Sequence, residues 1–83
     1  MQKIAIEKRL GSSVKNWRKQ LDISQHDLAQ RAGFHRSYIS DIERGSRNVS
    51  LKSIEKLAEA LGISIQTLFA EVDSKTASRI SAP

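Results

Sequence analysis

The side chains in this sequence that could do chemistry gather between residues 36 and 48, and their chemistry is hydrogen bonding. At helical spacing, one face of this stretch is polar and carries Ser37, Ser40, Asp41 and Arg44. The opposite face is apolar, with Ile39 and Ile42. Short hydroxyls leave room for a close approach to another surface, although an ordinary surface helix has a similar pattern. Arg36 and Ser37 occupy the first turn, where a helix that enters a DNA major groove makes its base contacts.

Other chemistry finds little support. His26 and His35 stand nine residues apart in a chain without cysteine, which is a poor arrangement for a metal ion. No glycine-rich phosphate loop is present, and the serines near acidic residues are too common to indicate a catalytic triad. We therefore expect no enzyme activity, no cofactor and no small-molecule ligand.

The charge of the chain favours a polyanionic partner. Its 83 residues include 14 Lys and Arg against 9 Asp and Glu, a formal net charge of +5. Almost all of the excess lies in residues 1–21, where six basic side chains face Glu7 as the only acidic one. The absence of cysteine fits a reducing compartment, and no apolar run approaches the roughly 18 residues of a membrane span. We expect a cytoplasmic protein that does not insert into a membrane.

Apolar spacing predicts an all-α protein with five helices. The first helix carries the stripe Ile6, Leu10, Val14, Trp17 and Leu21, and Gly11 lies within it at a cost of up to ~1 kcal/mol. The second begins after Ser24 and ends at Gly33, the third spans 36–44 and ends at Gly45, and Ser50 and Ser64 cap the last two. The fourth helix has the stripe Leu51, Ile54, Leu57, Ala58 and Leu61. We expect one domain over residues 1–70 and a disordered tail over 71–83.

Three ordered stretches, 23–29, 32–40 and 42–45, together resemble the helix-turn-helix of the phage repressor/Cro-like (XRE) family. The following run Arg47-Asn48-Val49-Ser50-Leu51 resembles, within that family, the controller proteins of restriction–modification systems. The resemblance covers roughly residues 10–70. It implies a compact five-helix bundle with a lambda-repressor-like DNA-binding domain. It also implies a homodimeric, sequence-specific transcription regulator that binds a pseudo-palindromic operator in double-stranded DNA.

The family's DNA-contacting positions fall on Gln25, Arg36, Ser37, Tyr38, Ser40, Arg44, Arg47 and Asn48. Arg36 and Arg47 are the candidates for reading bases, since an arginine can bridge guanine O6 and N7. The Tyr38 side chain either lies against the DNA backbone or closes the core. Arg44 either contacts phosphate or pairs with Asp41, and we expect Asp41 to orient a neighbouring arginine or to be a bystander. Arg18 and Glu43 match a family ion pair between the first and third helices.

Three positions depart from the family's pattern. Asp22 stands where a turn usually has Gly or Asn, His35 occupies the cap position of the third helix, and Trp17 replaces an aliphatic core residue. A cap role for His35 would require a neutral ring and would make the helix sensitive to pH.

For the dimer interface the candidates are Ile65, Leu68 and Phe69, and burial within the monomer is equally expected for Leu68. Two alternative functions stay open: an antitoxin or phage-type repressor, and a helix-turn-helix domain used for protein–protein contact.

Overall fold

Short polar residues and glycines set the limits of the helices. The computed structural model describes residues 4–72, within which the elements are α1 (Ile6–Gln20), α2 (Gln25–Ala32), α3 (Arg36–Arg44), α4 (Leu51–Leu61) and a fifth helical stretch at residues 65–72. Ser24 and Ser50 accept hydrogen bonds from the backbone N–H three residues later, at the starts of α2 and α4. Gly33, Gly45 and Gly62 end α2, α3 and α4 in the left-handed conformation. The five-helix, all-α prediction is therefore confirmed for the described residues.

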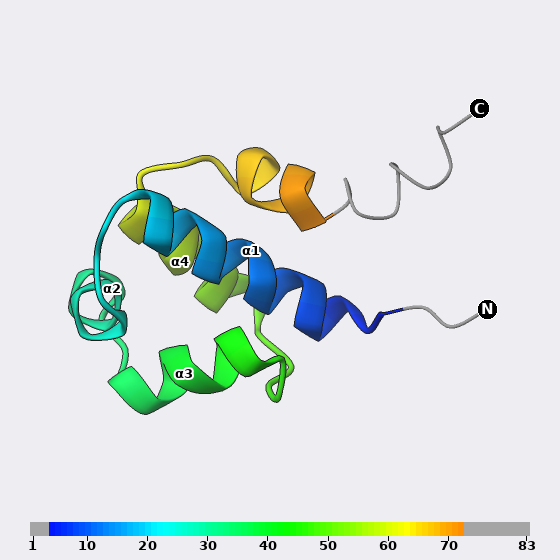
Figure 1. Cartoon of the computed structure of the whole chain (residues 1–83), viewed down its shortest axis with the longest axis horizontal. Coiled ribbons are helices and arrows are strands. Elements are labelled where there is room, and N and C mark those ends of the chain that lie inside the picture. Colours follow the sequence, from blue (N-terminus) through cyan, green and yellow to red (C-terminus); the bar gives the residue numbers. More distant parts are fainter. Residues whose placement is uncertain (1–3, 73–83) are drawn as a thin grey trace.

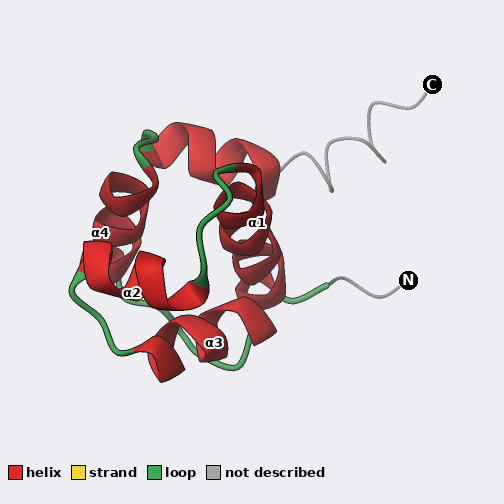
Figure 2. Cartoon of the chain, turned by 60° about the vertical axis from the view of Figure 1, so that its left-hand side comes forward, coloured by secondary structure: helices red, strands yellow, loops and turns green. Residues whose placement is uncertain are grey.

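The five helical stretches surround one core, with α3 and residues 65–72 on opposite sides of it. Both views place α1 and α4 between these two outer elements (Figures 1 and 2). Figure 1 looks almost along α2 while α3 lies across the view, so the two short helices cross steeply. Only two residues separate Gly33 from Arg36, and this short connection forces the crossing.

Apolar side chains from every element fill the core. Those with essentially no exposure are Val14, Leu28, Ile39, Ile42, Leu57, Leu68 and Val72. Val72 is thus a core residue, and helix extends to it, so the expected start of a disordered tail at residue 71 is wrong. The rest of that expected tail, from residue 73 on, lies outside the described residues.

Several expected core positions face solvent instead. Ile6 and Leu21, at the two ends of the α1 stripe, are 53% and 42% exposed, and Leu51 at the start of α4 is 76% exposed. Trp17 is half-buried against the core. The apolar stripes of α1 and α4 therefore extend beyond the core, because only the middle of α1 and the later turns of α4 face other helices.

Gly11 marks the closest approach between α1 and α3. A Cβ atom added there would overlap the carbonyl oxygen of Ile42 and lie 2.8 Å from that of Glu43. Only glycine permits the backbones to meet at this distance. The helix-propensity cost of Gly11 is thus offset by the packing of α1 against the last turn of α3.

Candidate nucleic-acid interface

The apolar face of α3 packs into the core, and this orients the polar face of the helix toward solvent. Ile39 and Ile42 are 0% and 1% exposed and fix the helix in the core. Arg36 and Ser37 in the first turn are exposed, as is Arg44 in the last. His35 precedes the helix in an extended conformation, but its side chain makes no capping hydrogen bond. The expected cap role of His35 is therefore wrong, and the first-turn N–H groups of α3 are not occupied by it.

Asp41 lies between two arginines at the end of this face. One carboxylate oxygen pairs with Nη2 of Arg44, and the other lies 3.4 Å from Nε of Arg47. Nη1 of Arg44 also donates to the Ser40 hydroxyl at 2.7 Å. Asp41 thus orients both arginines, as one of the two expected roles had it.

Arg47 is held a second time, by an aromatic ring. Its guanidinium carbon lies 5.2 Å from the centre of the Tyr38 ring, a cation–π geometry. The Tyr38 ring in turn packs edge-on against Phe34, with centroids 4.8 Å apart. The Tyr38 hydroxyl donates to Ser53 Oγ at 3.2 Å, which links α3 to α4. Tyr38 therefore supports Arg47 from the edge of the core. No pattern in the sequence indicated its partner Ser53.

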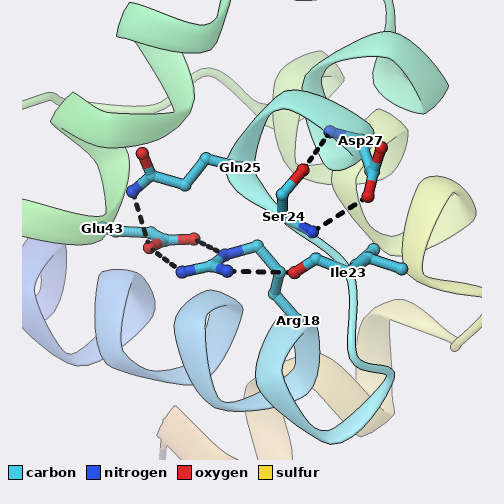
Figure 3. A network of polar contacts seen from close by, with 6 residues as sticks. All are labelled: Arg18, Ile23, Ser24, Gln25, Asp27 and Glu43. Atoms are coloured by element: carbon cyan, nitrogen blue, oxygen red, sulfur yellow. Dashed lines mark hydrogen bonds and ion pairs between the residues drawn. The ribbon is translucent and has the colours of Figure 1, made fainter.

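A partly buried ion pair fixes the position of α3 against α1. Arg18 Nε donates to one oxygen of Glu43 at 2.7 Å, and its Nη2 donates to the other at 3.0 Å (Figure 3). The Arg18 and Glu43 side chains are only 12% and 4% exposed. Hydrogen bonding to Glu43 raises the pKa of the Arg18 guanidinium against the opposing effect of desolvation. The structure thus contains the ion pair that the family resemblance implied.

The same carboxylate reaches α2. Gln25 Nε2 donates to Glu43 at 3.1 Å, and Arg18 Nη1 donates to the Ile23 carbonyl at 3.0 Å (Figure 3). Four segments, α1, the 21–24 connection, α2 and α3, therefore meet at one ion pair. Gln25, expected at a phosphate, is half-buried at the α2 N-terminus with its amide nitrogen already engaged.

At the start of α2 the backbone is closed by a reciprocal pair. Asp27 N–H donates to the Ser24 hydroxyl at 3.0 Å, and Ser24 N–H donates to the Asp27 carboxylate at 3.1 Å (Figure 3). The hydrogen bond from the Ser24 backbone lowers the pKa of Asp27 below its ordinary value. Asp22 just before it adopts φ 58°, the left-handed conformation in which Gly or Asn is more usual.

The chain following α3 completes the exposed surface. Gly45 turns the backbone, and both the N–H and the hydroxyl of Ser46 donate to the Asp41 carbonyl, at 3.0 and 3.1 Å. Arg47 and Asn48 are exposed directly after it. Lys8 of α1 packs so closely on Gly45 that a Cβ there would meet it, which brings one basic residue of α1 beside this turn. The sequence indicated a basic first helix, but it did not single out Lys8 beside this turn.

Comparison with known proteins decides the family. A helix-turn-helix family model matches residues 14–68, which include all of α2, α3 and α4. The chain belongs to this helix-turn-helix family.

Its relatives include control proteins. Control protein C.MunI from a Mycoplasma species is 39% identical over 71 residues, which cover 84% of this chain and 96% of that protein. Control protein C.SmaI from Serratia marcescens is 40% identical over 63 residues, covering 76% of this chain and 75% of that protein. The crystal structure of the restriction-modification controller protein C.AhdI from Aeromonas hydrophila matches with a TM-score of 0.77 at 42% identity, over 80% of this chain and 100% of that one.

The XRE resemblance, and the likeness to controller proteins within it, are thereby confirmed. As a member of this helix-turn-helix family the chain is a DNA-binding regulator of transcription. Its motif consists of α2 and α3, and the relatives are regulators and controller proteins. Within the described residues no three potential metal ligands gather, and no helix is long and apolar enough to cross a membrane.

The three expected interface residues of this helix-turn-helix protein differ in exposure. Leu68 is 0% exposed, so its expected place in a dimer interface is wrong and it belongs to the monomer's core. Phe69 is half-buried, and Ile65 is 40% exposed. Ile65 shares a hollow with Leu51, a residue that the sequence had assigned to the core, and the charged residues Lys52 and Glu55 line the rest of it.

Proposed function

We propose that this protein is a sequence-specific, controller-like regulator that binds a pseudo-palindromic operator as a homodimer in the cytoplasm. The observation that carries the proposal is the exposed polar face of α3. It is continued by the 45–48 turn, so that both base-reading candidates, Arg36 and Arg47, are exposed. A guanidinium that bridges guanine O6 and N7 contributes about 1–3 kcal/mol against a wrong base.

The DNA-contacting residues that we propose are Gln25, Arg36, Ser37, Tyr38, Ser40, Arg44, Arg47 and Asn48. They divide into base-reading and phosphate-positioning roles. Arg36 and Ser37 lie in the first turn of α3, which is the part of a recognition helix that reaches base edges. Gln25 lies at the N-terminus of α2, where the helix dipole favours a phosphate. Its side-chain amide nitrogen donates to Glu43, so a phosphate would meet the backbone N–H of this first turn.

Dimerisation is proposed from the size of the reading surface and from the exposed apolar residues. One α3 and its following turn span only a few base pairs, whereas two copies related by a twofold axis read both halves of a palindrome. Ile65 and Leu51 supply exposed apolar surface outside α3 and the 45–48 turn. In such a dimer the two α3 helices would stand about 34–36 Å apart, one turn of DNA.

Selection from a pool of random duplexes tests the proposal directly. The purified full chain is expected to enrich a sequence with twofold symmetry, and the affinity for it is expected to fall steeply with salt because phosphate contacts release counterions. Binding with a steep salt dependence but without a consensus would contradict sequence-specific regulation. Absence of binding would instead favour a helix-turn-helix used for protein contact.

A further inference from the structure

We propose that Asp41 is a specificity-determining residue, which weakens non-specific binding to DNA while it positions Arg47 for base contact. This inference rests on the proposed function. One carboxylate is shared between Arg44 and Arg47 on a surface that the proposed function turns toward DNA. The Asp41 side chain is 25% exposed, so its charge acts at that surface and is not hidden in the core.

Non-specific binding depends on cations that neutralise phosphates. Two of the cations on this face, Arg44 and Arg47, already have an anion between them. A phosphate that approaches either guanidinium must compete with Asp41, and it also meets the like charge of the carboxylate. Asp41 therefore reduces the attraction for phosphates that the two arginines would otherwise give this surface.

Base contact does not carry the same penalty. Arg47 uses its Nε for Asp41 and one face of its guanidinium for the Tyr38 ring. Among the described residues, neither Nη atom of Arg47 has a hydrogen-bond partner. The two Nη groups are one of the pairs with which an arginine can bridge the acceptors of a guanine, and these acceptors carry no net charge. Asp41 and Tyr38 thus hold Arg47 in a geometry that leaves a donor pair available for a base.

Asp41 should therefore affect the specificity ratio, which is the affinity for the preferred sequence divided by the affinity for an unrelated duplex. Replacing Asp41 by an amide of the same shape leaves both arginines without their anion and removes one negative charge from the surface. Binding to any duplex should become tighter through phosphates, while the order of preferred bases, which depends on Arg36 and Arg47, should stay the same.

The experiment compares Asp41→Asn with the wild-type chain on two duplexes over a series of salt concentrations. One duplex is the highest-affinity sequence that the wild-type chain selects from a random pool, and the other is a scrambled duplex of the same length and composition. Asp41→Asn should raise the affinity for the scrambled duplex by about tenfold and increase the magnitude of its salt slope by about 1, the value of one added phosphate contact. The affinity for the selected duplex should change by less than about threefold.

Glu59→Gln is the matched control, because it removes one negative charge from an exposed position on α4, which is not part of the α3 face or of the turn that follows it. It should change the affinities for both duplexes by the same factor. A second variant, Arg47→Lys, keeps the charge but loses the Nε contact and the fork, and it should weaken binding to the selected duplex more than to the scrambled one. Circular dichroism of each variant establishes that it is folded.

If Asp41→Asn shifts both affinities equally, as Glu59→Gln is expected to do, Asp41 acts only through net charge and the inference is wrong. The inference is also wrong if Asp41→Asn changes neither affinity, since the specificity ratio is then unchanged as well. Failure of the proposed function is distinguishable, because the wild-type chain would then select no consensus sequence at all, which also overturns the inference.

Discussion

At the scale of single residues, the Arg18–Glu43 pair is the interaction whose loss should cost the most. The Glu43 side chain is 4% exposed, so Arg18→Ala leaves a buried carboxylate whose remaining partner, within residues 4–72, is the Gln25 amide. An uncompensated buried charge costs about 3–5 kcal/mol. Removing both partners removes the charge as well, so Arg18→Ala with Glu43→Ala should be less destabilising than the two single changes added together. Urea denaturation of the four proteins measures this coupling.

The surface supplies a matched control for that cycle. Arg44 also pairs with a carboxylate, that of Asp41, but its side chain is 61% exposed. Exposed pairs contribute about 0–1 kcal/mol, so Arg44→Ala should change the free energy of unfolding far less than Arg18→Ala. Additive costs at Arg18 and Glu43 would mean that the pair does not act as a unit.

At the scale of elements, the contact between α1 and α3 depends on the absence of a side chain. Helix propensity alone predicts that Gly11→Ala stabilises α1 by about 0.5–1 kcal/mol. The added Cβ would overlap the Ile42 carbonyl, however, and backbone atoms cannot move aside as a flexible side chain can. We expect Gly11→Ala to destabilise the protein by about 3 kcal/mol, at the upper end of the cost of overpacking.

Thermal and urea unfolding of the Gly11→Ala variant measure this effect. Gly62→Ala is the comparison, because Gly62 has φ +71° but nothing within 4 Å of an added Cβ. Its cost should be about 1 kcal/mol, from the left-handed backbone alone. A stabilised Gly11→Ala variant would show that α1 and α3 can separate without loss.

The start of α2 should be sensitive to acid. The pKa of Asp27 is lowered in the folded state by the hydrogen bond from Ser24, relative to its ordinary value of 3.8. Its contribution to stability is therefore complete above the pKa of the unfolded state and is lost as the pH falls through the folded-state pKa. Asp27→Asn should reduce the amount by which the free energy of unfolding falls between neutral pH and pH values below 4. Urea denaturation at several pH values measures this difference. Glu59→Gln, an exposed carboxylate outside any cap, should leave that pH dependence closer to wild type.

The elements could be predicted from the sequence because their limits are local. Ser24 and Ser50 cap the residues directly after them, and Gly33 ends α2 through its own backbone conformation. The burial of individual side chains was harder to predict, because it depends on what the tertiary structure places opposite each residue. Leu51 lies on the same stripe as Leu57, yet it is 76% exposed while Leu57 is 0% exposed.

In the candidate site, too, some features could be predicted from the sequence and others depend on the tertiary structure. The residue types on the outer face of α3 follow from helical spacing, and the Arg18–Glu43 pair followed from the family resemblance. The contacts of Gln25 with Glu43 and of Tyr38 with Ser53 join residues 18 and 15 positions apart on different helices. No local pattern indicates such contacts, since they depend on how α2 and α4 pack against α3.

At the scale of the whole molecule, the basic charge and the base-reading surface come from different parts of the chain. The excess charge belongs to residues 1–21, whereas α3 and its following turn carry Asp41 and Glu43 among their arginines. Lys8 is the place where the two meet, since it packs on Gly45 beside the turn that carries Arg47. The first helix can thus supply long-range attraction to DNA, while base preference depends on a few residues of α3 and the turn.

The proposed twofold arrangement predicts which exposed apolar residues matter. Ile65 and Leu21 are nearly equally exposed, at 40% and 42%, but only Ile65 shares the hollow with Leu51. Burying a charge in a dimer interface is unfavourable, so Ile65→Glu should convert the dimer to monomer in sedimentation velocity. Leu21→Glu should leave the dimer intact. Because a monomer holds one half-site only, Ile65→Glu should also lose at least about tenfold in affinity for a symmetric duplex and little for a half-site. A wild-type chain that sediments as a monomer, or an Ile65→Glu variant that remains dimeric, would contradict this interface.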